Sequence, residues 1–165
     1  EEKISTPKGL LVTAKMLENK KLQLDHLINV EFPQNQNEIA EAKELGDLKE
    51  NAEFKAATEK QQQLNTKLSR LQDELSRAQV FDPSMITTAR VSFGTVVTLT
   101  NLETSKQIEY TILGPWESDV KNNIISYKSP IGEQLLNKKE GEEFTFTINE
   151  NVLSYRIEKI KAATF

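Results

Sequence analysis

The stretch Leu45-Gly46-Asp47-Leu48-Lys49-Glu50-Asn51 joins two segments of helical periodicity and decides the fold of the first half of the chain. On both sides of it, apolar residues recur mostly three, four or seven positions apart, which is typical of amphipathic helices. The pattern after it continues to Gln79 without Gly or Pro. Two helices joined by so short a turn are predicted to fold back on each other as an antiparallel coiled-coil hairpin.

The segment before this turn is predicted to hold two helices. Thr6-Pro7 predicts the start of the first, because Thr can cap a helix and Pro suits its first position. Pro33 predicts a break at Val30–Pro33, since proline cannot donate a backbone hydrogen bond and clashes with the preceding turn. Asn35 to Glu38 then indicates a new N-terminus, and Gly46 is expected to end the second helix in the left-handed conformation. The apolar stripe of the first helix is Leu10, Leu11, Ala14, Leu17, Leu24, Leu27 and Ile28.

The pattern changes after Phe81-Asp82-Pro83. From Arg90 onward, β-branched and aromatic residues form short runs separated by Gly, Asn and Pro, which indicates strands joined by turns. Ser129 followed by Pro130 predicts the start of one short helix. The fold class is therefore α+β: an N-terminal antiparallel coiled coil over residues 1–82, followed by a small, mainly antiparallel β domain with one short helix over 83–165. Expected strands cover residues 91–93, 95–99, 107–113, 124–127, 144–148 and 153–160.

The composition excludes several classes of protein. The formal net charge is −4, which lacks the basic footprint of a protein that binds nucleic acid unaided. There is no Cys, so disulfides and thiolate chemistry are excluded. No long apolar segment or signal-peptide pattern is present, and we therefore expect a soluble, cytoplasmic protein with no membrane contact.

Conventional catalytic constellations are also absent from the sequence. His26 is the single histidine, and without Cys or a second His it is expected to have a structural or surface role. Nothing supports a nucleophilic triad, and no Gly-rich phosphate loop occurs. Trp116 is expected to be half-buried on the β domain.

Two carboxylates in the turn have two interpretations. Asp47 and Glu50 have the spacing of an acidic capping box, which would satisfy free amides at the start of the second helix. The same pair offers two hard oxygen donors to Mg²⁺, which keeps several waters and uses few protein carboxylates. Local sequence favours capping, and two carboxylates alone would hold Mg²⁺ weakly.

Longer motifs resemble one known family. Residues Glu41 to Phe54 resemble the tip sequence of the bacterial GreA/GreB transcript cleavage factors, and Leu75 to Val80 resembles the end of their coiled coil. Val91 to Val97 and Ile125 to Ile131 resemble parts of their C-terminal domain. Because these motifs occur in the right order from about Thr6 onward, the chain is identified as a member of this family.

The resemblance implies a division of labour between the two parts. The C-terminal domain, of FKBP-like fold, would dock on RNA polymerase, and the coiled coil would enter the secondary channel of the enzyme. There Asp47 and Glu50 would help to hold a second Mg²⁺ shared with the polymerase active site, with no metal bound by this chain alone. The polymerase, not this chain, would then cleave backtracked RNA near its 3′ end. A monomer is expected, with no stable binding of nucleic acid by itself.

The resemblance also implies roles for residues around the tip and in the second domain. Tip and RNA contacts are expected at Lys43, Lys49, Lys55, Asn51 and Phe54, although a solvated charged face explains the lysines equally well. Thr58 stands where relatives often have Arg, so the basic patch is thinner here. Polymerase contacts are expected at Ser129, Pro130 and Ile131, although Pro130 is equally explained as the first residue of a helix.

Three alternative functions follow from the same features. An anti-cleavage relative would enter the same channel and inhibit polymerase, but such relatives alter the acidic tip. The FKBP-like fold raises a peptidyl-prolyl isomerase, but the family lacks the aromatic-lined isomerase pocket. A coiled-coil adaptor would use the tip acids only to cap a helix.

Overall fold

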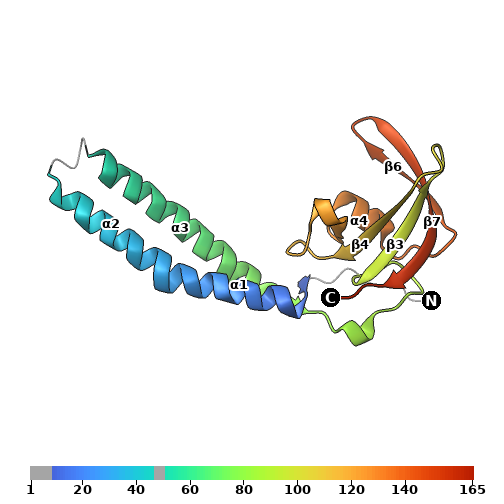
Figure 1. Cartoon of the computed structure of the whole chain (residues 1–165), viewed down its shortest axis with the longest axis horizontal. Coiled ribbons are helices and arrows are strands. Elements are labelled where there is room, and N and C mark those ends of the chain that lie inside the picture. The colour runs from blue at the N-terminus through green and yellow to red at the C-terminus, as the bar shows by residue number, and fades with distance from the viewer. Residues whose placement is uncertain (1–8, 47–50) are drawn as a thin grey trace. The chain divides into compact units, whose positions relative to one another are not determined.

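The computed structural model describes residues 9–46 and 51–165 of the chain (Figure 1). Thr6, Pro7, Asp47, Lys49 and Glu50 lie outside the described residues. The chain divides into two compact units. A helical unit comprises Leu17–Ala78, and a β unit comprises Glu1–Met16 together with Gln79–Phe165.

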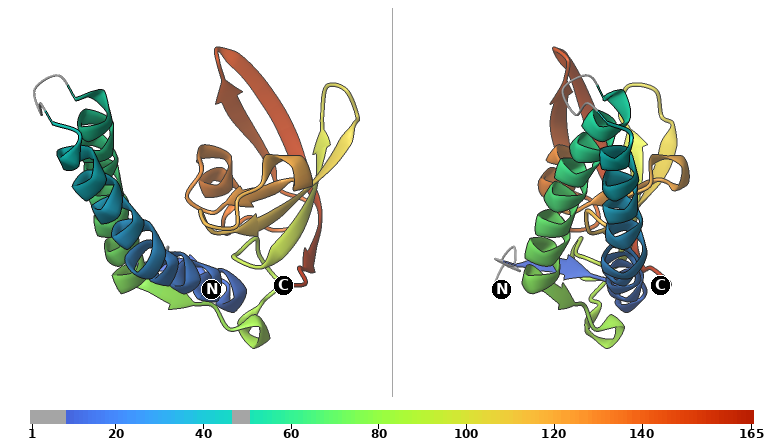
Figure 2. Two further views of the ribbon diagram at one scale, coloured as in Figure 1. Left: turned by 60° about the vertical axis from the view of Figure 1, so that its left-hand side comes forward. Right: turned by 90° about the vertical axis from the view of Figure 1, so that its left-hand side faces the viewer.

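The helical unit is an antiparallel hairpin, as predicted. Its first arm contains α1 (Ala14–His26), a π-helical turn at Leu27–Glu31, and α2 (Phe32–Glu44). Its second arm is α3 (Ala52–Arg77), which runs beside α2 (Figures 1 and 2). None of the helices in the described ranges is both long and apolar enough to cross a membrane.

The seam between the arms changes character along its length. Away from the turn, Leu27, Leu64 and Leu71 are buried and pack with neighbouring apolar side chains. Towards the turn, the buried apolar residues are Ala42 and Ala57. These small side chains allow the two backbones to approach closely near the turn.

The predicted start of the first helix is wrong, because Leu10–Val12 forms a strand, β1. Leu10 and Val12 point into the core, in the two-residue alternation of a strand. The helix begins after Thr13, whose Oγ1 accepts a hydrogen bond from the backbone N–H of Met16 (3.2 Å). β1 pairs with β2 (Ala78–Val80), so the start of α1 and the end of α3 meet in a two-stranded sheet.

The predicted break at Pro33 is also wrong. The first arm continues through this region in helical conformation, with Glu31 and Phe32 both in the right-handed region. Pro33 lies in the first turn of α2. The wider π turn just before it lets the helix accommodate a proline that a regular helix would not tolerate.

The β unit contains a five-stranded sheet with the order β5-β4-β3-β7-β6. All neighbours pair antiparallel except β4 and β5, which are parallel. A short helix, α4 (Pro130–Leu135), lies against one face of the curled sheet (Figures 1 and 2). The predicted α+β class is confirmed. The strands are β3 (Thr95–Asn101), β4 (Gln107–Leu113), β5 (Ile124–Ser126), β6 (Glu143–Ile148) and β7 (Asn151–Ala162).

Residues 91–93 are not a strand, contrary to the prediction, although Val91 and Phe93 are buried in the core. The backbone of Val91 instead pairs with the loop after α4, donating to the carbonyl of Lys138 and accepting from the N–H of Asn137 (both 2.9 Å). The apolar residues Val91 and Phe93 therefore reflect burial rather than a place in the sheet.

Tyr127 attaches β1 to the β unit. Its ring is buried, and its hydroxyl accepts a hydrogen bond from the backbone N–H of Leu11 (3.0 Å). Burial raises the pKa of this hydroxyl, with the Leu11 amide acting against the shift and Glu117 adding to it. Glu117 fixes the next contact along the chain, because its Oε1 accepts from the backbone N–H of Thr13 (2.7 Å).

We expect Tyr127→Phe to lower the free energy of unfolding of the β unit by about 1–2 kcal/mol, because the Leu11 amide loses its partner. Thermal unfolding followed by the fluorescence of Trp116, the single tryptophan of the chain, measures this. Tyr110→Phe, a half-buried tyrosine on β4, is the control and should change stability less. Equal effects of both substitutions would contradict the role given to the Tyr127 hydroxyl.

Candidate functional site: the turn of the helical hairpin

The end of α2 is built as the sequence indicates. Leu45 closes the helix with its backbone N–H bonded to the carbonyl of Ala42 (3.2 Å). Gly46 follows with a φ of +109°, a conformation that side-chain-bearing residues rarely adopt. The predicted left-handed termination at Gly46 is confirmed.

The start of α3 is capped by Asn51, not by the acids that precede it. The Oδ1 atom of Asn51 accepts a hydrogen bond from the backbone N–H of Phe54 (3.0 Å), and Ala52 is the first helical residue. Asp47 and Glu50 themselves are outside the described residues. However, the interpretation of this pair as the capping box of α3 is wrong, because the N-cap lies after both of them.

Asn51 also joins the two arms. Its Nδ2 atom donates to the carbonyl of Ala42 on α2 (2.6 Å). One side chain therefore caps α3 and ties it to the last turns of α2. The connection that contains Asp47 and Glu50 therefore joins two helices that this hydrogen bond holds together.

We expect Asn51→Ala to lower the free energy of unfolding of the helical unit by about 1–2 kcal/mol, the range found for lost N-caps. Urea unfolding followed by helical circular dichroism measures the change. Asn65→Ala, an exposed position within α3, is the matched control and should be neutral or slightly stabilising because Ala is the better helix former. An unchanged unfolding curve for Asn51→Ala would refute its capping role.

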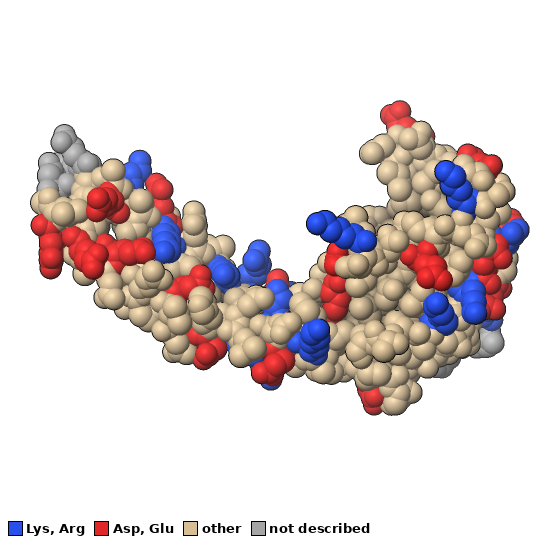
Figure 3. Space-filling model, in the orientation of Figure 1, with Lys and Arg blue, Asp and Glu red and all other residues tan. Residues whose placement is uncertain are grey.

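The other residues predicted at the tip are placed as follows. Lys43 in the last turn of α2 and Lys55 in α3 are both exposed, and Phe54 is half-buried. Lys49 is outside the described residues. The same end of the hairpin exposes Glu41, Glu44 and Glu53, and acidic side chains gather there (Figure 3). The described part of this surface is therefore not a basic patch.

The chemistry of the tip suits an incomplete metal site. Within residues 9–46 and 51–165, no group of three His, Cys, Asp or Glu side chains could hold a metal ion. Outside those ranges, Asp47 and Glu50 supply two carboxylates, a donor type that Mg²⁺ accepts while retaining waters. This donor set fits Mg²⁺ only with ligands from another molecule. His26 is remote from the turn in sequence and pairs with Glu31 (Nδ1 to Oε2, 3.4 Å).

The predicted polymerase contacts form the start of α4. Ser129 caps this helix, because its Oγ accepts from the backbone N–H of Gly132 (3.1 Å) and donates to the carbonyl of Ser126 (2.6 Å). Ile131 packs on the core of the β unit. Pro130 lies at the first position of the helix and is exposed. The predicted helix start is confirmed, and of the three residues only Pro130 is exposed.

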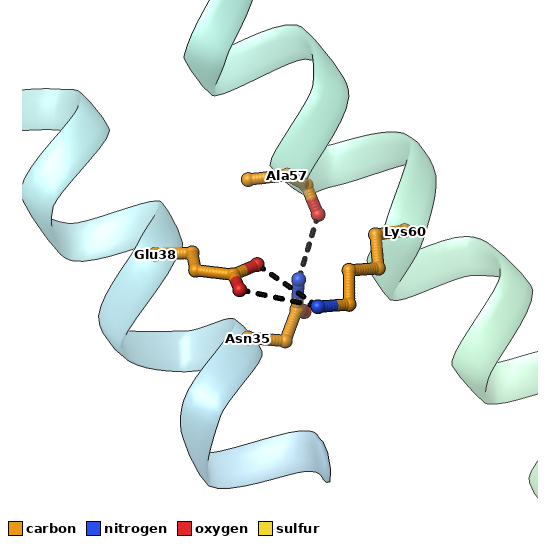
Figure 4. A network of polar contacts seen from close by, with 4 residues as sticks. All are labelled: Asn35, Glu38, Ala57 and Lys60. Atoms are coloured by element: carbon orange, nitrogen blue, oxygen red, sulfur yellow. Dashed lines mark hydrogen bonds and ion pairs between the residues drawn. The ribbon is translucent and has the colours of Figure 1, made fainter.

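Sequence reasoning missed Asn35. This residue is fully buried between α2 and α3, and its Nδ2 donates to the carbonyl of Ala57 (2.9 Å; Figure 4). Beside it, Lys60 pairs with Glu38 across the same two helices (3.1 Å). The signal was present, because Asn35 lies seven residues before Ala42 in the seam. Pro33 instead predicted a helix break in this region, which the structure does not contain.

Comparison with known proteins covers both units. The family model described as "Transcription elongation factor, N-terminal" matches residues 10–80, and "Transcription elongation factor, GreA/GreB, C-term" matches residues 86–162. The chain belongs to the GreA/GreB family. The match includes the hairpin with its turn and the sheet with α4, so the GreA/GreB architecture extends over both units.

Two sequence relatives agree with this assignment. "Transcription elongation factor GreA" of Treponema pallidum (strain Nichols) is 54% identical over 156 residues, which are 94% of this chain and 96% of that protein. The GreA of Borreliella burgdorferi is 45% identical over 95% of this chain, a stretch that makes up 17% of that longer protein. A solved GreA/GreB factor from Nitrosomonas europaea aligns over 92% of this chain and 98% of its own, at 20% identity and a TM-score of 0.42.

Proposed function

We propose that this chain binds RNA polymerase and stimulates the polymerase to cleave backtracked RNA, so that arrested transcription resumes. The observation that carries the proposal is the hydrogen bond from Asn51 to Ala42, which ties α3 to α2 on either side of the sequence segment that contains Asp47 and Glu50. Membership of the GreA/GreB family of transcription elongation factors supports it. The bond that is hydrolysed belongs to the RNA, and the active site belongs to the polymerase.

The two units have separate tasks in this proposal. The β unit docks on the polymerase through the region around Pro130, which is exposed on a helix anchored in the core. The helical unit enters the secondary channel with its turn leading. Small seam residues, Ala42 and Ala57, keep the leading end slender. Because bacterial transcription occurs in the cytoplasm, we place the protein there. We expect it to act as a monomer.

The acids of the turn act together with the polymerase. Asp47 and Glu50 would contribute carboxylate oxygens to a Mg²⁺ ion that the polymerase also binds, so that neither protein would have to hold the ion alone. Such an ion, when bound, lowers the pKa of a coordinated water and stabilises the charge that develops on the phosphate. The contribution of this chain is position: it delivers two negative charges at the end of a supported helix pair.

Binding to RNA contributes little to affinity in this mechanism. The exposed glutamates 41, 44 and 53 lie at the same end as Lys43 and Lys55, and they oppose a general attraction to phosphate. Lys43, Lys49 and Lys55 can still contact the RNA 3′ segment once docking has brought it close. Docking on the polymerase therefore supplies the local concentration that the acidic surface does not.

The direct test uses stalled, backtracked transcription complexes with labelled RNA. Addition of the wild-type chain with Mg²⁺ should release short 3′ fragments much faster than the polymerase alone and allow elongation to resume. If the chain binds polymerase but slows both cleavage and nucleotide addition, it is an anti-cleavage factor. Failure to bind polymerase would refute the proposal altogether.

A further inference from the structure

Asn35 is a buried polar side chain at a place where an apolar one would be expected. It is fully buried between the arms of the hairpin, and its Nδ2 donates to the carbonyl of Ala57 on the opposite helix (2.9 Å; Figure 4). Its Oδ1 has no hydrogen-bond partner among the described residues. Burial of a half-satisfied amide opposes folding, so the residue is not explained by stability.

The seam around Asn35 offers few other contacts that depend on register. Leucines at positions 27, 64 and 71 interlock farther from the turn. Between Asn35 and the turn the buried apolar residues are Ala42 and Ala57, whose small side chains form shallow ridges. The pair of Lys60 and Glu38 is more than a third exposed on both sides and contributes little. Two directional hydrogen bonds therefore cross between the arms in this half of the hairpin. The bond from Asn35 to Ala57 is buried, whereas the bond from Asn51 to Ala42, nearer the turn, is only partly buried.

The π turn is what brings Asn35 into the seam. On α3 the buried residues Ala57, Leu64 and Leu71 are seven positions apart, the repeat of a coiled coil. On the other arm, Asn35 and Ala42 are also seven apart, but Leu27 and Asn35 are eight apart. The turn at Leu27–Glu31 absorbs the additional residue. A regular helix would present Gln34, which is exposed, in place of Asn35.

We propose that Asn35 is a positioning residue that fixes the register of α2 against α3, and thereby sets where the connection carrying Asp47 and Glu50 projects. A polar residue at one seam position is a known means of selecting a single register at some cost in stability. A slide by one helical turn moves one arm by about 5.4 Å. That displacement exceeds the roughly 0.5 Å tolerance of a catalytic constellation. The consequence for cleavage rests on the proposed function, whereas the register itself does not.

The register of α2 against α3 can be measured without a cleavage assay. The chain has no native Cys, so nitroxide labels can be placed at Asn37→Cys and Gln63→Cys, exposed positions on α2 and α3. With Asn35 present, pulsed electron paramagnetic resonance should give a single narrow distribution of distances between the two labels. With Asn35→Leu, we expect a second or shifted distance, by up to about 5 Å for a one-turn slide. Gln36→Leu, the same change in polarity at an exposed neighbour, should leave the distance unchanged.

The melting temperature and the cleavage assay complete the test. Asn35→Leu should melt at the same or a higher temperature, because the unsatisfied amide is removed. It should lower the maximal rate of fragment release by about tenfold to a hundredfold, with the half-saturating concentration unchanged, because the docking unit is intact. A single distance, equal to that of the wild type, in both Asn35→Leu and Asn35→Ala would overturn the proposal. If the leucine variant does not fold, the distance in Asn35→Ala alone decides. If Asn35→Leu shifts the distance but the wild-type protein promotes no cleavage, the proposed function is refuted and the register assignment stands.

Discussion

Replacement of Asp47 or Glu50 by alanine should reduce the rate of fragment release from backtracked complexes by about a hundredfold, the loss typical when one preorganised electrostatic contact to a transition state is removed. Each substitution removes one carboxylate from a metal ion that this chain cannot hold alone. The rate of 3′ fragment release at saturating protein measures the effect. The half-saturating concentration should not change, because the β unit and α4 are untouched.

Stability separates this role from capping. Because Asn51 supplies the N-cap of α3, we expect each variant to change the unfolding free energy of the hairpin by less than about 0.5 kcal/mol. Glu44→Ala, an exposed carboxylate in the last turn of α2, is the matched control and should cleave as the wild type does. Normal cleavage by Asp47→Ala and Glu50→Ala would refute the metal-holding role. Early melting together with weak binding would show that the two acids act mainly through the stability of the hairpin.

The sequence predicted those features that depend on local chemistry and periodicity. The hairpin followed from apolar spacing on both sides of one short connection, and Gly46 has the predicted left-handed backbone. Ser129 and Pro130 begin α4 as their residue types indicate. In each case the residues that support the prediction are close in sequence to the feature that they predict.

Features that depend on distant contacts were not predictable in the same way. Leu10 to Val12 has an apolar pattern that suits a helix or a strand, and the strand forms because Tyr127 and β2 pair with it. Pro33 is a strong helix breaker by itself, but a π turn before it keeps the arm continuous. The Asp47–Glu50 pair has the spacing of a capping box, but α3 begins at Ala52, and its cap is Asn51, which the sequence did not indicate.

Gly132→Ala is expected to have the largest effect on stability, lowering the unfolding free energy of the β unit by about 3 kcal/mol, the upper range of overpacking. Gly132 is buried in α4, and a Cβ atom there would meet the backbone carbonyl oxygen of Ser126 far inside van der Waals contact. That oxygen cannot move away freely, because it accepts hydrogen bonds from both the N–H and the Oγ of Ser129. The thermal transition reported by Trp116 fluorescence should fall by roughly 15 °C.

Helix propensity alone predicts the opposite sign, since alanine stabilises a helix interior by about 1 kcal/mol relative to glycine. Gln134→Ala, an exposed position in the same helix, is the control for introducing alanine without a steric clash and should leave the transition nearly unchanged. In the proposed function Gly132→Ala should also raise the half-saturating concentration for cleavage, because the cap at Ser129 and the exposed Pro130 depend on the same turn. A stabilised Gly132→Ala protein would show that α4 can shift away from Ser126, and a shifted α4 that still docks normally would remove Pro130 from the proposed polymerase contact.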